Sequence, residues 1–87
     1  MDKYVGDYKG YKIYISNKYP KKYYAIVNQK KVYFGDIRYQ HFFDKMGVYS
    51  FLNHYDKKRR KLFKIRHEKN RHKKGTAAWF SDQILWS

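Results

Sequence analysis

The chain has 87 residues, no cysteine, and a formal net charge of +14 at pH 7. This length predicts a single small domain over 1–87, in which a large enclosed active site is not expected, and the lack of cysteine excludes disulfides and thiolate metal ligands within the chain. Its uncharged runs are too short to span a bilayer and its first residues lack the apolar stretch of a signal peptide, so an intracellular protein without a membrane span is expected.

The first part of the chain predicts a small antiparallel sheet. Residues 1–10 show no sustained hydrophobic period and are expected to be a loose lead-in, or to pair at a sheet edge. The next residues alternate in polarity and place Tyr11, Ile13 and Ile15 on one face of a strand. Two stretches of turn residues then separate further β-branched and aromatic runs, so a three-stranded meander is expected over 11–35.

Residues 49–71 predict one long basic amphipathic helix that covers this sheet. On a helical wheel the apolar residues gather in one wide sector, and a row of cations lies opposite. The apolar sector consists of Phe51, Leu52, Tyr55, Leu62, Phe63 and Ile65. The opposite row includes Lys57, Arg60, Lys61 and Lys64. Residues with good helix propensity follow one another here, so the helix is expected to fray only near Asn70.

A short aromatic helix is expected over 76–87, where Thr76 is the residue that caps its start. Two uses of this apolar segment stay open, because it either closes the core or contacts a partner through Trp79, Phe80 and Trp86. Core closure is the favoured use. The fold class is then α+β, with the three-stranded sheet packed by one long and one short helix.

The charge of the second half of the chain points to an anionic partner. Between Lys57 and Lys74 the chain carries eleven cations and a single acid, Glu68. A solvated helix face is normally mixed in sign, so this excess favours anion binding over a merely soluble surface. No base-reading motif is present, which predicts binding to the phosphate backbone of nucleic acid, most readily duplex DNA, without sequence preference. The residues expected to bind are Lys57, Lys58, Arg60, Lys61, Lys64, His67, Arg71, Lys73 and Lys74.

Arg59 and Arg66 do not fit the amphipathic pattern, because both fall inside the apolar sector, seven residues apart. A desolvated guanidinium needs acceptors. One interpretation is that the two residues bond backbone carbonyls or the carboxylates of Asp36 and Asp44. The other is that their forked donors bind a phosphate.

Two further kinds of site have weaker support in the sequence. Exposed tyrosines can stack on bases, although packing on the sheet and on lysine stems is the favoured alternative. The tyrosines concerned are Tyr14, Tyr19, Tyr23 and Tyr33. The histidine spacings match no standard metal motif, so neither a metal nor another cofactor is expected and the chain is not expected to be an enzyme. A small metal-dependent nuclease built on His54, Asp56 and His67 stays as the remaining enzyme alternative.

Several short motifs follow one another over about two thirds of the chain. They are Phe34-Gly35; Asp44, Lys45, Gly47, Tyr49 and Ser50; His54 with Asp56 to Arg60; Arg66-His67; and Trp79 to Ser81 with Leu85-Trp86. This order resembles a family of small basic proteins of unassigned function encoded by large double-stranded DNA viruses, with shorter relatives in tailed phages. The chain departs from the pattern at Phe51, where a polar residue is usual, and at Phe63, where tyrosine is usual.

The resemblance implies a viral setting and says little about mechanism. The protein is then expected inside an infected host cell, in the nucleus or the cytoplasm, and in the virion as well. A minor structural component of the virion, which binds acidic protein surfaces, is therefore the alternative to a nucleic-acid-binding protein.

Overall fold

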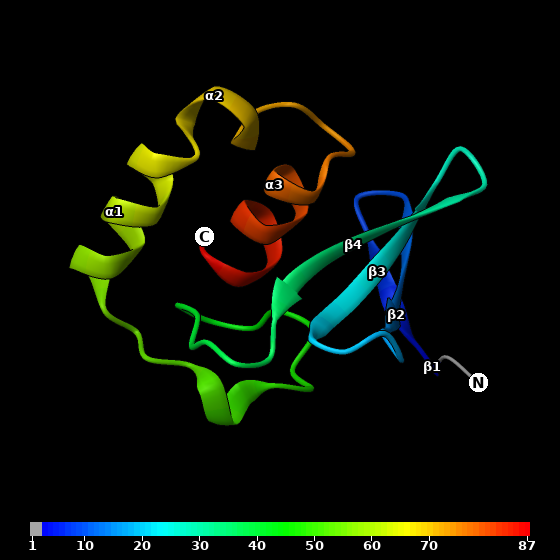
Figure 1. Ribbon diagram of the computed structural model, residues 1–87, viewed down its shortest axis with the longest axis horizontal. Coiled ribbons are helices and arrows are strands. Elements are labelled where there is room, and N and C mark those ends of the chain that lie inside the picture. The colour runs from blue at the N-terminus through cyan, green and yellow to red at the C-terminus, as the bar shows by residue number, and fades with distance from the viewer. Residues whose placement is uncertain (1–2) are drawn as a thin grey trace.

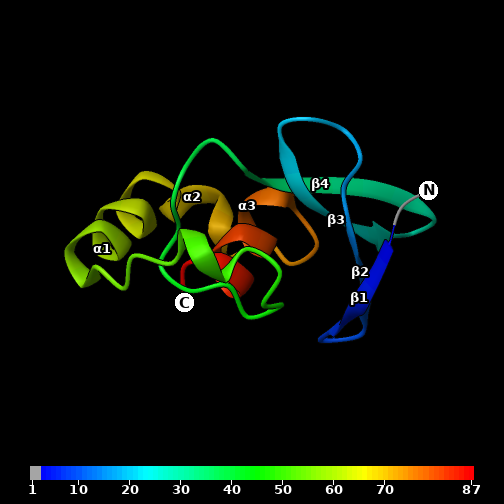
Figure 2. The same cartoon turned by 90° about the horizontal axis from the view of Figure 1, so that it is seen from below.

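The computed structural model describes residues 3–87, which form an antiparallel sheet with its helices gathered on one side (Figures 1 and 2). The strands are β1 (Lys3–Tyr8), β2 (Tyr11–Ile15), β3 (Lys21–Val27) and β4 (Lys30–Asp36), in that spatial order. The α+β class is confirmed, but the expected three strands are four. Of the two alternatives for the first residues, the loose lead-in is wrong over 3–8 and pairing at a sheet edge is confirmed, because β1 is an edge strand; residues 1 and 2 lie outside the described residues.

Local chemistry explains how the strands are joined. Asn28 and Gln29 both have positive φ, 50° and 68°, as a two-residue type I′ turn between β3 and β4 requires. A β-bulge between Tyr4 and Gly6 shifts the register of β1 against β2. The bulge breaks the alternation of side chains along β1, which is why the sequence pattern did not reveal this strand.

The helical half consists of short elements, and the predicted single helix over 49–71 is wrong. The elements are η1 (Ser50–Leu52), α1 (Lys57–Arg66), α2 (Glu68–Arg71), α3 (Ala77–Phe80) and the π-helical turn η2 (Ser81–Leu85). The main helix cannot begin earlier because Tyr55 has a φ of 56°. Asp56 then caps it, since its carboxylate accepts the backbone N–H groups of Lys58 and Arg59.

The sheet is covered by the C-terminal elements rather than by α1. In Figure 1, α3 lies between β4 and α1, so the expectation that the long helix covers the sheet is wrong. Phe80 and Ile84 are fully buried, and Phe80 stacks on Phe34 of β4 with ring centroids 5.3 Å apart. As expected, Thr76 caps α3 by accepting the backbone N–H of Trp79.

The core takes in most of the C-terminal rings. Trp79 and Phe80 belong to the buried cluster, so the interpretation that they contact a partner is wrong and the favoured core closure is confirmed. Trp86 packs against this cluster but stays partly exposed. Of the three rings, it is therefore the one that can meet another molecule.

Candidate nucleic-acid interface

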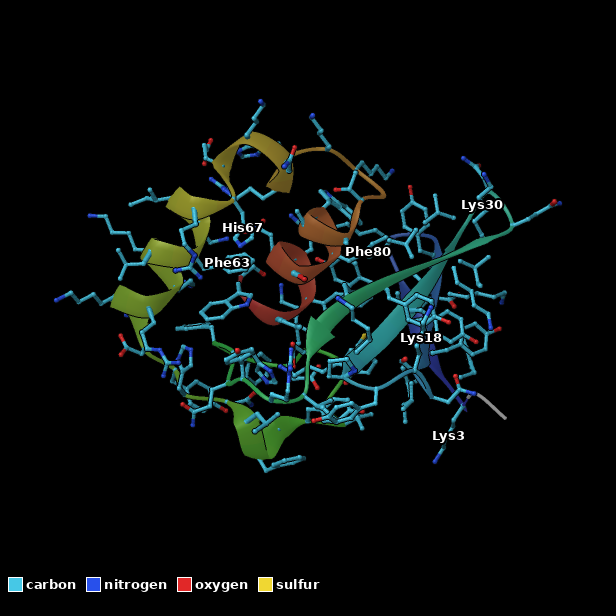
Figure 3. The ribbon with its side chains drawn as sticks, viewed as in Figure 1. Lys3, Lys18, Lys30, Phe63, His67 and Phe80 are labelled. Carbon is cyan, nitrogen blue, oxygen red and sulfur yellow. The ribbon has the colours of Figure 1, made fainter. Side chains whose placement is uncertain are left out.

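The inner face of α1 is mostly polar. Arg60, Phe63, Lys64 and His67 are the buried or half-buried residues of this stretch, spaced as one side of a helix. Phe63 stacks on Trp86 with centroids 4.6 Å apart and planes 4° from parallel. Figure 3 shows Phe63 and His67 pointing from α1 toward the C-terminal elements. This face docks α1 onto the tail.

The predicted apolar sector is not the buried face of the helix. Leu62 and Ile65 are 48% and 61% exposed, and Phe51 and Tyr55 lie before the helix and are exposed as well. The predicted sector assumed that one continuous helix runs through Tyr55. Once the helix starts at Lys57, a single large ring, Phe63, is enough to anchor it, and the remaining anchors are cations.

Part of the predicted cation row makes contacts within the fold. Lys64 Nζ lies 2.5 Å from Asp82 Oδ1, and Arg71 contacts both Asp82, at 3.6 Å, and Glu68, at 2.7 Å. The guanidinium of Arg60 lies over the ring of Phe42, 4.5 Å from its centroid. These three cations therefore make contacts within the fold. Asp82 and Phe42, which these cations contact, lie in distant parts of the chain. A helical wheel of residues 49–71 therefore could not predict these contacts.

A smaller group of cations does face solvent. Within the described residues their side chains have no hydrogen bond or ion pair, and all are exposed. We call them the outer lysines: Lys57, Lys58, Lys61, Lys69 and Lys73. Lys74 is exposed too, with its ammonium 5.8 Å from the centroid of the Tyr11 ring. His67 packs on Phe63 at 4.3 Å, and burial lowers its pKa, so it adds no cation to this surface.

The acids of the described residues form no ion pair with the outer lysines, because each acid is held by another group. Asp36 pairs with Arg38, Asp44 accepts the hydroxyl of Tyr23, and Asp82 pairs with Lys64. The others are held by Tyr4, by the start of α1, and by Arg71 with His72; they are Asp7, Asp56 and Glu68. The positive excess therefore appears on the outer side of α1 and α2.

Beside α1 lie two adjoining hollows of about 350 and 310 Å³. Both are lined by Tyr39, Gln40, Arg66 and Trp86, so we treat them as one feature, the α1 groove. Arg59 lines the smaller hollow, and Lys21, Lys22 and His67 line the larger. The groove is thus lined by cations from β3 and α1 and by the aromatic side chains of Tyr39 and Trp86. Sequence reasoning missed Lys21, Lys22, Tyr39 and Gln40, which have no pattern that ties them to α1.

The two arginines that did not fit the amphipathic pattern both line the α1 groove. Arg59 donates from Nη1 to the amide oxygen of Gln40 at 3.0 Å. Arg66 has no hydrogen-bond or ion-pair partner within residues 3–87. The interpretation that they bond Asp36 or Asp44 is wrong, because those carboxylates are held by Arg38 and Tyr23.

A buried chain of polar side chains extends from Lys22 in the lining of the groove. Lys22 Nζ donates to the Tyr39 carbonyl at 3.1 Å and to His41 Nδ1 at 2.7 Å. Since an ammonium has no acceptor, the His41 proton sits on Nε2 and is donated to Asn53 Oδ1, 2.6 Å away. Burial lowers the pKa of Lys22 to about 8 and that of His41 to about 4, with the Lys22 charge as the second cause for His41.

Most of the tyrosines of the sheet pack against one another. Tyr4, Tyr14, Tyr24 and Tyr33 occupy paired positions across the four strands, with neighbouring ring centroids 5.1 to 5.5 Å apart. Tyr14 and Tyr24 are stacked, whereas the other two neighbouring pairs meet edge-on or at a tilt. Lysine ammonium groups lie over the rings of Tyr4, Tyr24 and Tyr33, as the favoured alternative expected. Tyr23 is fully buried and cannot stack on a base. Tyr19 is exposed on the turn before β3.

The histidines and acids do not gather into a metal site. Within residues 3–87 no group of three or more metal-ligating side chains is close enough to hold an ion. His54 Nδ1 accepts the backbone N–H of Asp56, whose own carboxylate caps α1. The nuclease alternative based on these two residues and His67 therefore finds no ligand cluster in the described part of the chain.

Comparison with known proteins adds no relative. No protein-family model matches the chain, and no curated protein or solved structure matches it. Within the described residues, none of the helices combines the length and the apolar character needed to cross a membrane.

Proposed function

We propose that this protein binds nucleic acid, most readily duplex DNA, through the phosphate backbone and without sequence preference. The observation that carries the proposal is the group of outer lysines on α1, α2 and the turn that follows, exposed and without acidic partners in the described residues. Such a surface releases counterions when phosphates replace them, which makes binding strong at low salt and weak at high salt.

The proposal leaves out the cations that make contacts within the fold. Arg60, Lys64 and Arg71 contact Phe42 and Asp82 and are assigned to the fold. The proposed interface is correspondingly smaller than the cation run in the sequence. The sequence of this surface contains no base-reading motif. We therefore favour contact with the phosphate backbone over recognition of bases. The viral setting, inside an infected cell and in the virion, is part of the proposal and follows from the motif resemblance.

Fluorescence anisotropy with a labelled duplex tests the proposal. We expect two duplexes of unrelated sequence, with 5′-hydroxyl ends, to bind with equal affinity that falls steeply between about 50 and about 500 mM salt. Affinity that is unchanged across this salt range would contradict the proposal. Competition by a polyglutamate chain as effective as that by DNA would instead favour the alternative partner, an acidic protein surface.

A pair of charge-matched variants locates the interface. Replacing Lys57, Lys58 and Lys61 by glutamate should abolish duplex binding. The fold should survive because all three side chains are exposed and have no hydrogen-bond or ion-pair partner within residues 3–87, and because glutamate is favourable in the first turn of a helix, where Lys57 and Lys58 lie. The control replaces Lys3, Lys18 and Lys30 by glutamate, which changes the net charge by the same amount. These three residues lie far from α1, on the sheet side of the molecule (Figure 3). If both variants lose the same affinity, net charge alone governs binding and the outer lysines are not the interface.

A further inference from the structure

The α1 groove differs from the outer lysines in shape and in size. Its larger hollow holds about 350 Å³, at the lower end of the range of small-molecule sites, roughly 300–1,000 Å³. This is room for one nucleotide unit. A duplex is far too wide to enter, so whatever binds in the groove is a single residue of a strand or a small molecule.

The two arginines of the groove have no acidic partner within residues 3–87. The single acid in its lining, Asp36, is held by Arg38 through two bonds, Nε to Oδ1 at 3.0 Å and Nη2 to Oδ2 at 2.7 Å. Arg59 meets only the neutral amide of Gln40, and Arg66 meets no partner within residues 3–87. The groove therefore presents unneutralised guanidinium groups to whatever occupies it.

The two arginines and the indole of Trp86, which line the same hollow, suit a specific chemistry. Arg59 and Arg66 are seven residues apart on α1, so their Cα atoms are separated by about 10 Å along the axis. Both line the same hollow as Trp86, whose indole is held in place by stacking on Phe63. Forked donors bind phosphate oxygens, and an aromatic wall accepts a base or a sugar.

We propose that the α1 groove binds a phosphate monoester that carries a base, and that its source is the 5′-phosphorylated end of a nucleic-acid strand. This inference rests on the proposed nucleic-acid binding and adds recognition of the strand end. A terminal phosphate carries nearly two negative charges, whereas each internal diester carries one. Only a strand end, or a free nucleoside monophosphate with the same chemistry, presents that dianion to a groove too narrow for a duplex.

Anisotropy with two single-stranded oligonucleotides of one sequence, one 5′-phosphorylated and one 5′-hydroxyl, tests the inference. The phosphorylated strand should bind about tenfold tighter, the size expected for added charge-assisted hydrogen bonds. Equal binding of the two strands overturns the inference, and salt-sensitive duplex binding can still hold in that case. If adenosine monophosphate removes the preference, the monophosphate alone is a sufficient ligand. If it does not, the strand is required as well.

Matched variants separate the groove from the general surface. Arg66→Gln should abolish the preference for the phosphorylated strand. Lys61→Gln, the control on the same helix, should weaken binding of both strands and keep the preference. Neither side chain has an intramolecular partner within residues 3–87, so both variants should melt at the temperature of the parent protein. A preference that survives Arg66→Gln overturns the assignment of the groove.

Discussion

Lys64 Nζ lies 2.5 Å from Asp82 Oδ1, and this ion pair joins α1 to η2. The Asp82 side chain is 4% exposed, whereas that of Lys64 is 27% exposed. Arg71 supports the same carboxylate from 3.6 Å. Lys64, which the sequence placed on the binding face, is therefore a structural residue.

The first prediction is that Lys64→Met destabilises the protein by about 2 kcal/mol. Removing one partner of a buried ion pair costs roughly 3–5 kcal/mol, and Arg71 reduces the loss here by remaining beside Asp82. Equilibrium urea denaturation measures the change. Lys61→Met, at an exposed site on the same helix, should stay within about 0.5 kcal/mol of the parent protein. Equal effects of the two variants would show that the pair with Asp82 adds nothing.

The second prediction concerns Asp44, which organises the loop before η1. Its carboxylate accepts the Tyr23 hydroxyl at 2.6 Å and the backbone N–H groups of Met46 and Tyr49 at 2.9 and 2.8 Å. Burial is the main reason why the pKa of Tyr23 lies far above its ordinary value, so the phenol stays a donor.

Tyr23→Phe should therefore cost about 2 kcal/mol in urea denaturation, because it leaves a buried carboxylate short of one donor. Tyr49→Phe is the matched control, since its hydroxyl makes only a 3.4 Å contact with the Lys22 carbonyl. We expect that control to cost less than about 1 kcal/mol. A larger loss for Tyr49→Phe than for Tyr23→Phe would contradict this account of the loop.

Local patterns in the sequence were sufficient for the inner strands. The alternation that places Tyr11, Ile13 and Ile15 on one face is confirmed, since all three belong to or pack against the core. This alternation has a period of two residues, so a short stretch of sequence is enough to reveal it. The pattern fails for β1, where the bulge beside Gly6 moves side chains out of that period.

The helix and the groove required contacts that no short window contains. The choice of Phe63 and Lys64 as inward residues is set by Trp86 and Asp82, about twenty positions further along the chain. Arg59 and Arg66 were found because they violate the amphipathic pattern, and a cation in an apolar sector is a local signal. The opposite wall of the groove gave no such signal.

The third prediction is a loss of stability in mild acid, traced to His41. Its pKa is about 4 in the folded protein because of burial and of the nearby Lys22 ammonium, against about 6.5 when unfolded. Between these values the unfolded chain binds more protons, so stability falls as the pH is lowered from 6.5 to 4. The pKa values of His54 and His67 are lowered too and act in the same direction.

Urea denaturation at several pH values between 4 and 6.5 measures this slope. His41→Gln keeps a side-chain acceptor for Lys22 and a donor for Asn53 but removes the titrating ring. The variant should therefore be less stable near neutral pH and show a clearly shallower fall in acid. Parallel stability curves for the parent protein and the variant would show that His41 does not titrate as described.

The fourth prediction separates backbone strain from steric conflict at two glycines with similar backbone geometry. Gly35 and Gly47 have φ values of 77° and 84°, where any other residue costs about 1–2 kcal/mol. A Cβ on Gly47 would meet nothing within 4 Å, whereas one on Gly35 would lie 2.9 Å from Leu85 Cδ1 and 3.0 Å from Lys22 Cδ.

Because Leu85 and Lys22 are both buried, neither can move aside freely. Gly47→Ala should thus cost only the strain of its conformation, and Gly35→Ala should cost about 1–3 kcal/mol more through overpacking. Since Gly35 also lines the α1 groove, its alanine variant should lose the preference for a 5′-phosphorylated strand while Gly47→Ala keeps it. Urea denaturation gives the first comparison and oligonucleotide anisotropy the second. If the two alanine variants are equally stable, Leu85 and Lys22 do not resist a Cβ at Gly35, and the expected steric conflict is absent.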